Sequence, residues 1–536
     1  MIKTFLERIE HAPLTFPGWT LAFLGIVVTR IFLENFSNIP PTGNWTSDAS
    51  TIVHYSFYYL AVTVSLLLFL GLFVNRAKLE RLALIALIGN VVAPLLDLAL
   101  SERVGSPMHY IFAEGMELAR NFVMPFSAAG ITTGMKIEFV LGACVLLWYI
   151  TYATRSVGKA VCAVLGSYAI SFFWGSLPSI WKSVHGFFSP DGGALSISQF
   201  FVESEATSVV ARNFLHPTTQ VPYFRGTEIF FNVAVSHLYY ILIFALTAIY
   251  FFVRHRAMFL AVLKNSRQFR AAHYYLMIGL GLFAGLKIVP SLIAWNWLDV
   301  ASLAVLFIAY ACARSYAGGV NDIEDLEADR ISNPARSLPS GLLDARDLKN
   351  ANIFFLLWAL LGGFLAGQYA LFTIVAALFM SHIYSVPPLR LKNYPLIATF
   401  LIAGSSFAAF AAGFYFAISD KTTIVMPVSY IALILAGLTL GENVKDIKDI
   451  DGDRKAGVFT LPVIFGEKNG KRIVGGMAAA AFLLVPLVLR IEVMLIPSIL
   501  AGAGVYFLVN RRRYSERPIF LLASFYAAYA VWAVLL

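Results

Sequence analysis

Charged residues are what this sequence has least of. Only 13% of its 536 residues are Asp, Glu, Lys or Arg, whereas 59% are hydrophobic. An average soluble protein carries roughly 25% charged residues. The low charge therefore excludes a disordered chain, a collagen-like rod and an ordinary soluble enzyme. It indicates an all-α, polytopic membrane protein.

Cysteine is almost as scarce. The three cysteines, Cys144, Cys162 and Cys312, all fall inside apolar runs, which excludes a disulfide framework and favours buried packing. The net charge of +9 does not indicate nucleic-acid binding, because the basic residues lie in short loops between apolar runs. That placement is how membrane topology is encoded. We therefore expect no nucleic-acid partner.

Long apolar runs are the main positive feature. A span across a ~30 Å hydrocarbon core needs roughly 20 residues, and we expect about fifteen spans, six before a basic, amphipathic stretch at Arg254–Arg270 and nine after it. They lie near 18–36, 54–74, 81–100, 135–153, 160–181, 227–253, 274–294, 297–316, 351–367, 370–385, 395–416, 424–442, 471–488, 493–510 and 518–535. The shorter segment 108–127 is expected to be interfacial or re-entrant. The chain thus divides into an N-terminal membrane domain, 1–260, and a C-terminal domain, 268–536.

The loops between the spans predict the orientation. Those rich in Lys and Arg, such as Arg254–Arg270 and Arg511–Arg513, all fall on one side when the spans are counted from a cytoplasmic N-terminus. Basic loops mark the cytoplasmic side. We therefore expect a multi-pass protein of the cell membrane, with its N-terminus in the cytoplasm.

The acids are crowded into two short stretches. Of 31 Asp and Glu, five lie in Asp322–Asp329 and five in Glu442–Asp453. The first stretch has aspartates at 322, 325 and 329, and the second at 446, 449 and 453. This shared i, i+3, i+7 spacing would place three carboxylates on one face of an α-helix. Both stretches fall at the cytoplasmic ends of spans.

Two matched faces of like charge suit a divalent cation. Mg²⁺ prefers oxygen ligands and is typically held by one or two carboxylates and substrate phosphates, so the two faces predict a metal–diphosphate site. A solvated acidic helix end explains one cluster equally well, but two clusters with one spacing much less well. Basic residues nearby would neutralise the diphosphate and stabilise it as a leaving group. They are Arg314, Arg336, Arg390, Lys392 and Lys445.

Together these residues resemble the signature of the UbiA-type membrane prenyltransferase superfamily. Arg314-Ser-Tyr-Ala-Gly-Gly-Val-Asn321-Asp-Ile-Glu-Asp325-Leu-Glu-Ala-Asp329 is similar to the family's first aspartate motif. Tyr384-Ser-Val-Pro-Pro-Leu-Arg390-Leu-Lys392 resembles its cytoplasmic loop, and Lys445-Asp-Ile-Lys-Asp449-Ile-Asp-Gly-Asp453 resembles its second motif. The match covers roughly 268–536, about half of the chain.

The resemblance implies a bundle of nine helices that transfers an isoprenoid chain from a polyprenyl diphosphate, geranylgeranyl or similar, to an acceptor. It implies two Mg²⁺ ions and a substrate tail that stays in membrane lipid. The implied metal ligands are Asn321, Asp325, Asp329, Asp446, Asp449 and Asp453. Among them Asp325, Asp329, Asp449 and Asp453, together with Tyr384, are implied to be catalytic; the tyrosine would stabilise developing positive charge or orient the acceptor.

Two other functions stay open at this point. With no acceptor, the allylic cation would cyclise, as in UbiA-like terpene cyclases. An ion or phosphate transporter is less well supported, because such sites lie near the bilayer midplane at broken helices of repeated halves. The acceptor and the function of residues 1–260 are not predicted, although shaping lipid access or recruiting an acceptor is one hypothesis for that domain.

Overall fold

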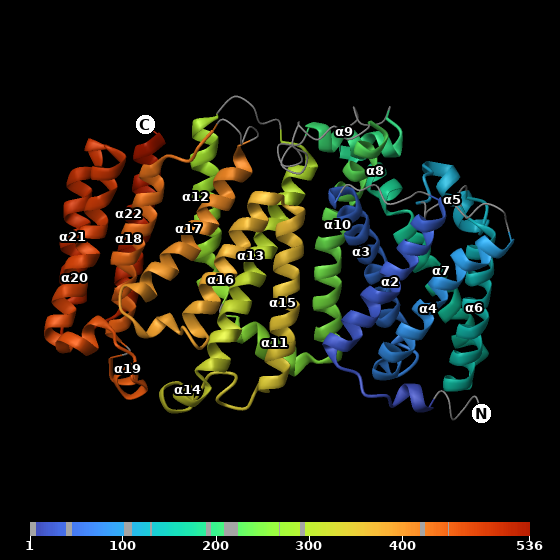
Figure 1. The fold of residues 1–536 in the computed structure, drawn as a ribbon, viewed down its shortest axis with the longest axis horizontal. Coiled ribbons are helices and arrows are strands. Elements are labelled where there is room, and N and C mark those ends of the chain that lie inside the picture. The colour runs from blue at the N-terminus through green and yellow to red at the C-terminus, as the bar shows by residue number, and fades with distance from the viewer. Residues whose placement is uncertain are drawn as a thin grey trace. The chain divides into compact units, whose positions relative to one another are not determined.

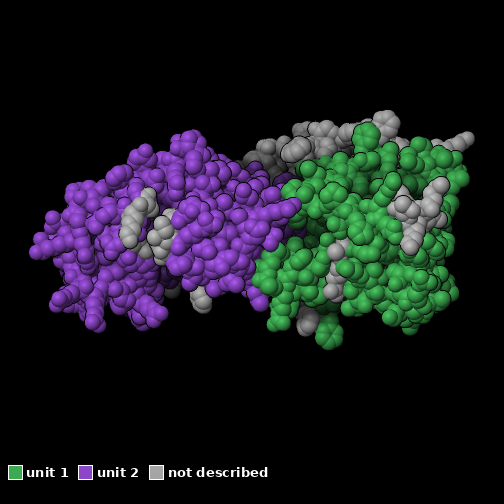
Figure 2. All heavy atoms as spheres, turned by 90° about the horizontal axis from the view of Figure 1, so that it is seen from below, with its two compact units in different colours: residues 1–259, 294–305 green, residues 260–293, 306–536 purple. Residues whose placement is uncertain are grey.

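The computed structural model describes residues 7–38, 45–100, 110–128, 131–188, 195–207, 223–266, 268–289, 295–418, 424–448 and 450–535. Every regular element in these ranges is a helix. The chain forms two compact units: unit 1 comprises residues 1–259 and 294–305, and unit 2 comprises residues 260–293 and 306–536. Figure 2 shows the two units in separate colours. The division after residue 259 falls inside the basic stretch Arg254–Arg270.

Unit 1 contains the helices drawn in blue to green in Figure 1. Apolar runs become helices because a helix satisfies its own backbone N–H and C=O groups, which lipid cannot do. The helices are α2 (Phe16–Asn38), α3 (Trp45–Leu70), α4 (Arg76–Leu100), α5 (Gly115–Val123), α6 (Thr133–Thr154), α7 (Val157–Gly175), α8 (Leu177–Phe188), α9 (Ile197–Thr207) and α10 (Tyr223–Arg254). Helix α5 lies in the segment expected to be interfacial; it has nine residues and none is buried.

Unit 2 contains most of the second half of the chain, drawn in yellow to red in Figure 1. Two helices, α11 (Arg256–Asn265) and α13 (Trp297–Glu324), begin in unit 1 and continue into unit 2. The others are α12 (Gln268–Ile288), α14 (Leu326–Ser332), α15 (Ala345–Leu365), α16 (Gln368–Ser385), η3 (Leu391–Asn393), α17 (Ile397–Ala417), α18 (Val428–Gly441), η4 (Glu442–Ile447), α19 (Ile450–Ala456), α20 (Leu461–Leu489), η5 (Glu492–Met494), α21 (Leu495–Val509) and α22 (Glu516–Leu535).

Thirteen helices in the described ranges are long and apolar enough to cross a membrane. They coincide with thirteen of the fifteen expected runs. The run at 274–294 forms a shorter apolar helix, Ala272–Ile288, and the run at 518–535 forms α22, which begins with the charged residues Glu516 and Arg517. The all-α, multi-pass architecture is therefore confirmed.

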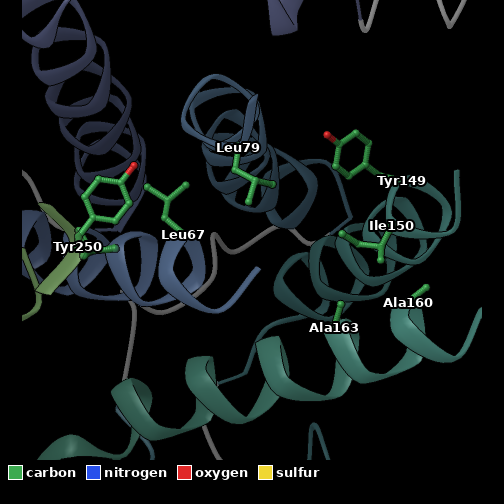
Figure 3. Packing of buried hydrophobic residues seen from close by; sticks show 8 residues of the cluster. Leu67, Leu79, Tyr149, Ile150, Ala160, Ala163 and Tyr250 are labelled. Carbon is green, nitrogen blue, oxygen red and sulfur yellow. The ribbon is translucent and has the colours of Figure 1, made fainter. Parts of the chain in front are cut away.

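The core of unit 1 brings five membrane helices together, and Figure 3 shows its side chains. Ile150 of α6 is fully buried against Ala160 and Ala163 of α7. Those two alanines are three residues apart and share one face of α7, and their small size lets the helices approach closely. The expectation that all three cysteines are buried is wrong for Cys144 and Cys162, which are exposed on α6 and α7. A thiol behaves as a small hydrophobe, so it is tolerated on the apolar outer surface of these spans.

Helices α12 and α17 of unit 2 meet backbone to backbone. A Cβ atom on Gly281 would lie 1.9 Å from the carbonyl oxygen of Phe410, and one on Gly413 would lie 2.0 Å from that of Ile278. Only glycine at both positions permits this approach. Gly285 meets Phe414, one turn beyond Phe410, so the two helices run in the same direction. The pair holds the start of α12 beside the middle of α17.

Candidate active site

The first acidic motif lies where α13 ends. Asp325 has φ −98° and ψ 7°, and α14 begins at the next residue. The prediction of one continuous α-helical face is therefore wrong, because the helix breaks at Asp325. The one-turn spacing survives the break, since Asp325 N donates to Asn321 O at 2.9 Å and Asp329 N donates to Asp325 O at 2.8 Å.

Asn321 and Asp325 share one ammonium group. Lys392 Nζ donates to Asp325 Oδ1 at 2.5 Å and to Asn321 Oδ1 at 3.3 Å. Arg390 Nη2 adds a hydrogen bond of 3.0 Å to Asp325 Oδ1. Ser385 Oγ donates to Asn321 Oδ1 at 3.1 Å. Burial lowers the pKa of Lys392, and the adjacent Asp325 opposes that shift by favouring the charged ammonium.

A guanidinium group pairs with the other two aspartates of the first motif. Arg336 Nη1 donates to Asp329 Oδ2 and lies 3.8 Å from Asp322 Oδ1. Asn333 Nδ2 donates to Asp329 Oδ1 at 3.0 Å. The side chains of Asp322 and Asp329 are only 2% and 7% exposed. Buried carboxylates need paired cations, because leaving one charge unpaired away from water is costly.

The second motif begins on the 3₁₀ helix η4, not on an α-helix. This helix ends at Ile447, and the chain continues into α19. The predicted α-helical face is therefore wrong here too. Because a 3₁₀ helix has three residues per turn, Val444 and Ile447 share one face, which is buried against α20 and α21. Lys445 and Asp446 lie off that apolar face. Asp449 lies outside the described residues.

Anchors to the end of the chain hold η4 in place. Tyr514 Oη donates to the carbonyl oxygen of Val444. Lys448, directly after η4, donates to Glu516 at the start of α22, at 3.0 Å. The position of the second motif therefore depends on contacts with residues far along the chain, which a local sequence pattern cannot reveal.

The fold brings the two motifs together. Tyr384, at the end of α16, interacts electrostatically with Asp325 of the first motif and with Asp446 and Asp453 of the second. The charge of Lys445 acts on the same hydroxyl. Helices α14 and α19, which carry parts of the two motifs, are in contact, and Figure 1 shows both at the same end of the spans of unit 2. The sequence prediction that the motifs face one another is consistent with this geometry.

Arg314 lies two turns before Asn321 on α13, inside a membrane span. In the described part of the chain it has no carboxylate within 4.0 Å. Its Nη1 folds over Gly318, where a Cβ atom would lie 3.1 Å away. An intramembrane arginine without an acidic partner is costly, so this guanidinium is suited to an anionic ligand.

The first motif contains oxygen pairs that converge on cations. No three His, Cys, Asp or Glu side chains in the described ranges converge tightly enough to hold a metal by themselves. Mg²⁺ needs only one or two protein carboxylates when phosphate oxygens complete its shell. The ammonium of Lys392 lies between Asn321 and Asp325, and the guanidinium of Arg336 lies between Asp322 and Asp329. Each basic group shows that a pair of oxygens converges on one cation.

Sequence reasoning missed two supporting residues. Ser385 fixes the amide of Asn321, and its only signal was its place directly after Tyr384 in the loop motif. Asn352 of α15 packs on α13, where a Cβ on Gly319 would lie 2.0 Å from its Oδ1. Nothing in the local pattern marks Asn352, because its partner is a glycine more than thirty residues away.

Comparison with known proteins identifies the family. The model of the UbiA prenyltransferase family matches residues 278–529. A digeranylgeranylglyceryl phosphate synthase of Methanocaldococcus jannaschii is 33% identical over 226 residues, which are 41% of this chain and 73% of that protein. A probable homogentisate phytyltransferase of Oryza sativa is 29% identical over 266 residues, 45% of this chain and 68% of that protein. A solved UbiA homolog from Archaeoglobus fulgidus, bound to GPP and Mg²⁺, aligns with a TM-score of 0.42 and 17% identity, over 52% of this chain and 100% of that one. The extent and identity of the sequence matches show that this chain belongs to the UbiA prenyltransferase family.

Proposed function

We propose that unit 2 transfers an isoprenoid chain from a polyprenyl diphosphate to a small or lipid acceptor inside the membrane. The observation that carries this proposal is the meeting of two acidic motifs with buried and partly buried basic side chains at one end of the spans. A diphosphate leaving group needs both signs of charge: cations on its oxygens, and carboxylates to hold those cations that are metal ions. The basic loops, which mark the cytoplasmic side, support a site on the cytoplasmic side of the cell membrane.

Two Mg²⁺ ions would be held by Asn321, Asp325 and Asp329 of the first motif and by Asp446, Asp449 and Asp453 of the second. When bound, Mg²⁺ supplies Lewis-acid stabilisation of the departing diphosphate. The proximity of Lys392 to Asp325 suggests that this lysine neutralises the carboxylate in the free protein and turns to the diphosphate in the complex. Arg336 is placed to make the same exchange at Asp329.

The other basic groups bind the diphosphate from the membrane side. Arg314 has no acidic partner in the described ranges, so its charge is available to phosphate oxygens. Lys445 lies beside the second motif, where it pairs with Glu442 at 3.7 Å. Tyr384 lies between the motifs, where its ring would stabilise the allylic cation that forms as the carbon–oxygen bond breaks. The apolar tail remains in lipid or among the apolar spans, which keeps water away from the cation.

The direct test uses the purified full chain, Mg²⁺ and labelled geranylgeranyl diphosphate. It is incubated with a panel of acceptors: homogentisate, chlorophyllide and a glycerophosphate lipid. We expect a prenylated product of one panel member, identified by mass, and no product in EDTA. A cyclised hydrocarbon in place of a prenylated acceptor would contradict the transfer reaction. Full activity in EDTA would contradict the role of the metal.

A variant pair tests the first motif. We expect Asp325→Ala to abolish turnover without unfolding the protein, because Asp325 contacts the basic groups of the site and not the apolar core. Glu327→Gln is the matched control, since Glu327 lies two residues away with its side chain 82% exposed. Full activity of Asp325→Ala, or equal losses in both variants, would contradict the assignment.

A further inference from the structure

One histidine outside both motifs is built into the interior of unit 2. His273 lies near the start of α12, and its Nε2 is 2.9 Å from Ser406 Oγ on α17. Ser406 Oγ donates its own proton to the carbonyl oxygen of Ile402 at 2.9 Å. The hydroxyl therefore accepts from the imidazole, which places the ring proton on Nε2 and leaves Nδ1 as the basic nitrogen.

The charged groups around this histidine belong to the proposed site. His273 interacts electrostatically with Arg314 of the first motif and with Glu442 and Lys445 at the start of the second. The next residue, Tyr274, interacts with the same three groups. This agrees with the packing, because α17 contacts both α12 and η4. His273 is partly buried, so its side chain is not completely enclosed by the helices around it.

Prenyl transfer needs a group of this kind. When the acceptor forms its new bond to the isoprenoid, its reacting O–H or C–H group loses a proton. The carboxylates of the motifs are poorly suited to take it, because their oxygens hold cations. A neutral imidazole with an available basic nitrogen is suited to general-base catalysis. In the described part of the chain, Nδ1 of His273 makes no hydrogen bond, so it is available.

We propose that His273 is the general base that accepts the proton of the acceptor. This inference rests on the proposed function. The bond between C1 of the isoprenoid and the diphosphate oxygen breaks, and its electron pair leaves with the diphosphate. The acceptor atom forms the new bond to C1, and its proton passes to Nδ1. Ser406 holds the ring in the required tautomer, and Glu442 stabilises the imidazolium that forms.

The test separates ionisation from transfer in the purified full chain. With Mg²⁺ and labelled geranylgeranyl diphosphate but no acceptor, release of diphosphate reports ionisation followed by slow capture of the cation by water that enters the empty acceptor position, which needs no side-chain base. With the panel acceptor that the wild-type chain uses fastest, product formation reports transfer. We expect His273→Asn to keep diphosphate release within about twofold and to lower the kcat of transfer roughly 10²- to 10⁴-fold. Added imidazole should restore part of the transfer to His273→Ala.

Two further variants complete the test: a control at another histidine, and a variant of the residue that positions His273. His382→Asn should match wild type in both assays, since His382 is exposed on α16 and the hydrogen bond of its ring in the described ranges is to Tyr316 Oη, at 3.3 Å. Ser406→Ala should lower transfer less than His273→Asn and gain nothing from imidazole, because the base is still present but poorly oriented.

Three results would overturn the inference. They are wild-type transfer in His273→Asn, equal losses of diphosphate release and transfer in that variant, and a wild-type chain that releases diphosphate yet transfers to no panel acceptor. If the wild-type chain neither releases diphosphate nor transfers, the proposed function itself fails. That outcome differs from the other three, because it appears before any variant is made.

Discussion

Substituting Gly281 by alanine should separate the two helices that support the interior of unit 2. The added Cβ would lie 1.9 Å from the carbonyl oxygen of Phe410, whereas real Cβ contacts are never closer than about 3.0 Å. The clashing atom belongs to the backbone of α17, so no side-chain rotation relieves it, and α12 must move by more than an ångström. Gly279→Ala is a matched control on the same helix, because nothing lies within 4 Å of its Cβ position.

Overpacking of this kind costs typically about 1–3 kcal/mol, whereas alanine for glycine at an open helical position gains up to about 1 kcal/mol. The two variants should therefore differ by about 1–4 kcal/mol, which corresponds to melting temperatures on the order of a few °C apart. Intrinsic tryptophan fluorescence during heating in detergent measures this. Gly281→Ala should also slow transfer, since the His273–Ser406 contact joins the same helices. Equal melting temperatures for the two variants would refute the backbone-contact argument.

Two further predictions concern the charged groups. Lys392→Met should raise the KM for geranylgeranyl diphosphate roughly tenfold or more, because a charge-assisted hydrogen bond contributes about 1.5–3 kcal/mol; an unchanged KM in steady-state assays would exclude Lys392 from the diphosphate site. Asp446→Asn should lower activity roughly 10- to 100-fold at limiting Mg²⁺. Asp451→Asn should have no effect, since its side chain is 93% exposed; similar Mg²⁺ dependence of both variants would argue against Asp446 as a ligand.

The sequence predicts the composition of the proposed site but not the local geometry of its two motifs. Arg314, Asn321, Asp325 and the loop with Lys392 are predicted from residue types and spacing, because the proposed chemistry requires both carboxylates and cations. The helical face inferred from that spacing was wrong in both motifs. The chain breaks at Asp325 and tightens into a 3₁₀ helix at η4, since contacts with distant residues outweigh the local preference for a regular helix.

His273 is a residue of the proposed site that the sequence did not predict. A single histidine near the start of an apolar run has no pattern that separates it from a packed side chain. Its significance depends on Ser406, 133 residues away, and on charges from α13 and η4. Such contacts are set by the way α12 and α17 pack, which depends on glycines whose roles appear only when the two backbones are seen together.

The membrane class, most of the spans and the family follow from the sequence alone. Low charge, the length of the apolar runs and three motifs in order can all be recognised without knowing the tertiary structure. Tertiary structure was needed to show which cation pairs with which acid. Lys392 and Arg390 meet Asp325 across more than sixty residues, and Arg336 meets Asp322 and Asp329 after a turn. The electrostatic attraction between two charged groups depends on their distance in space. That distance is determined by how the helices pack.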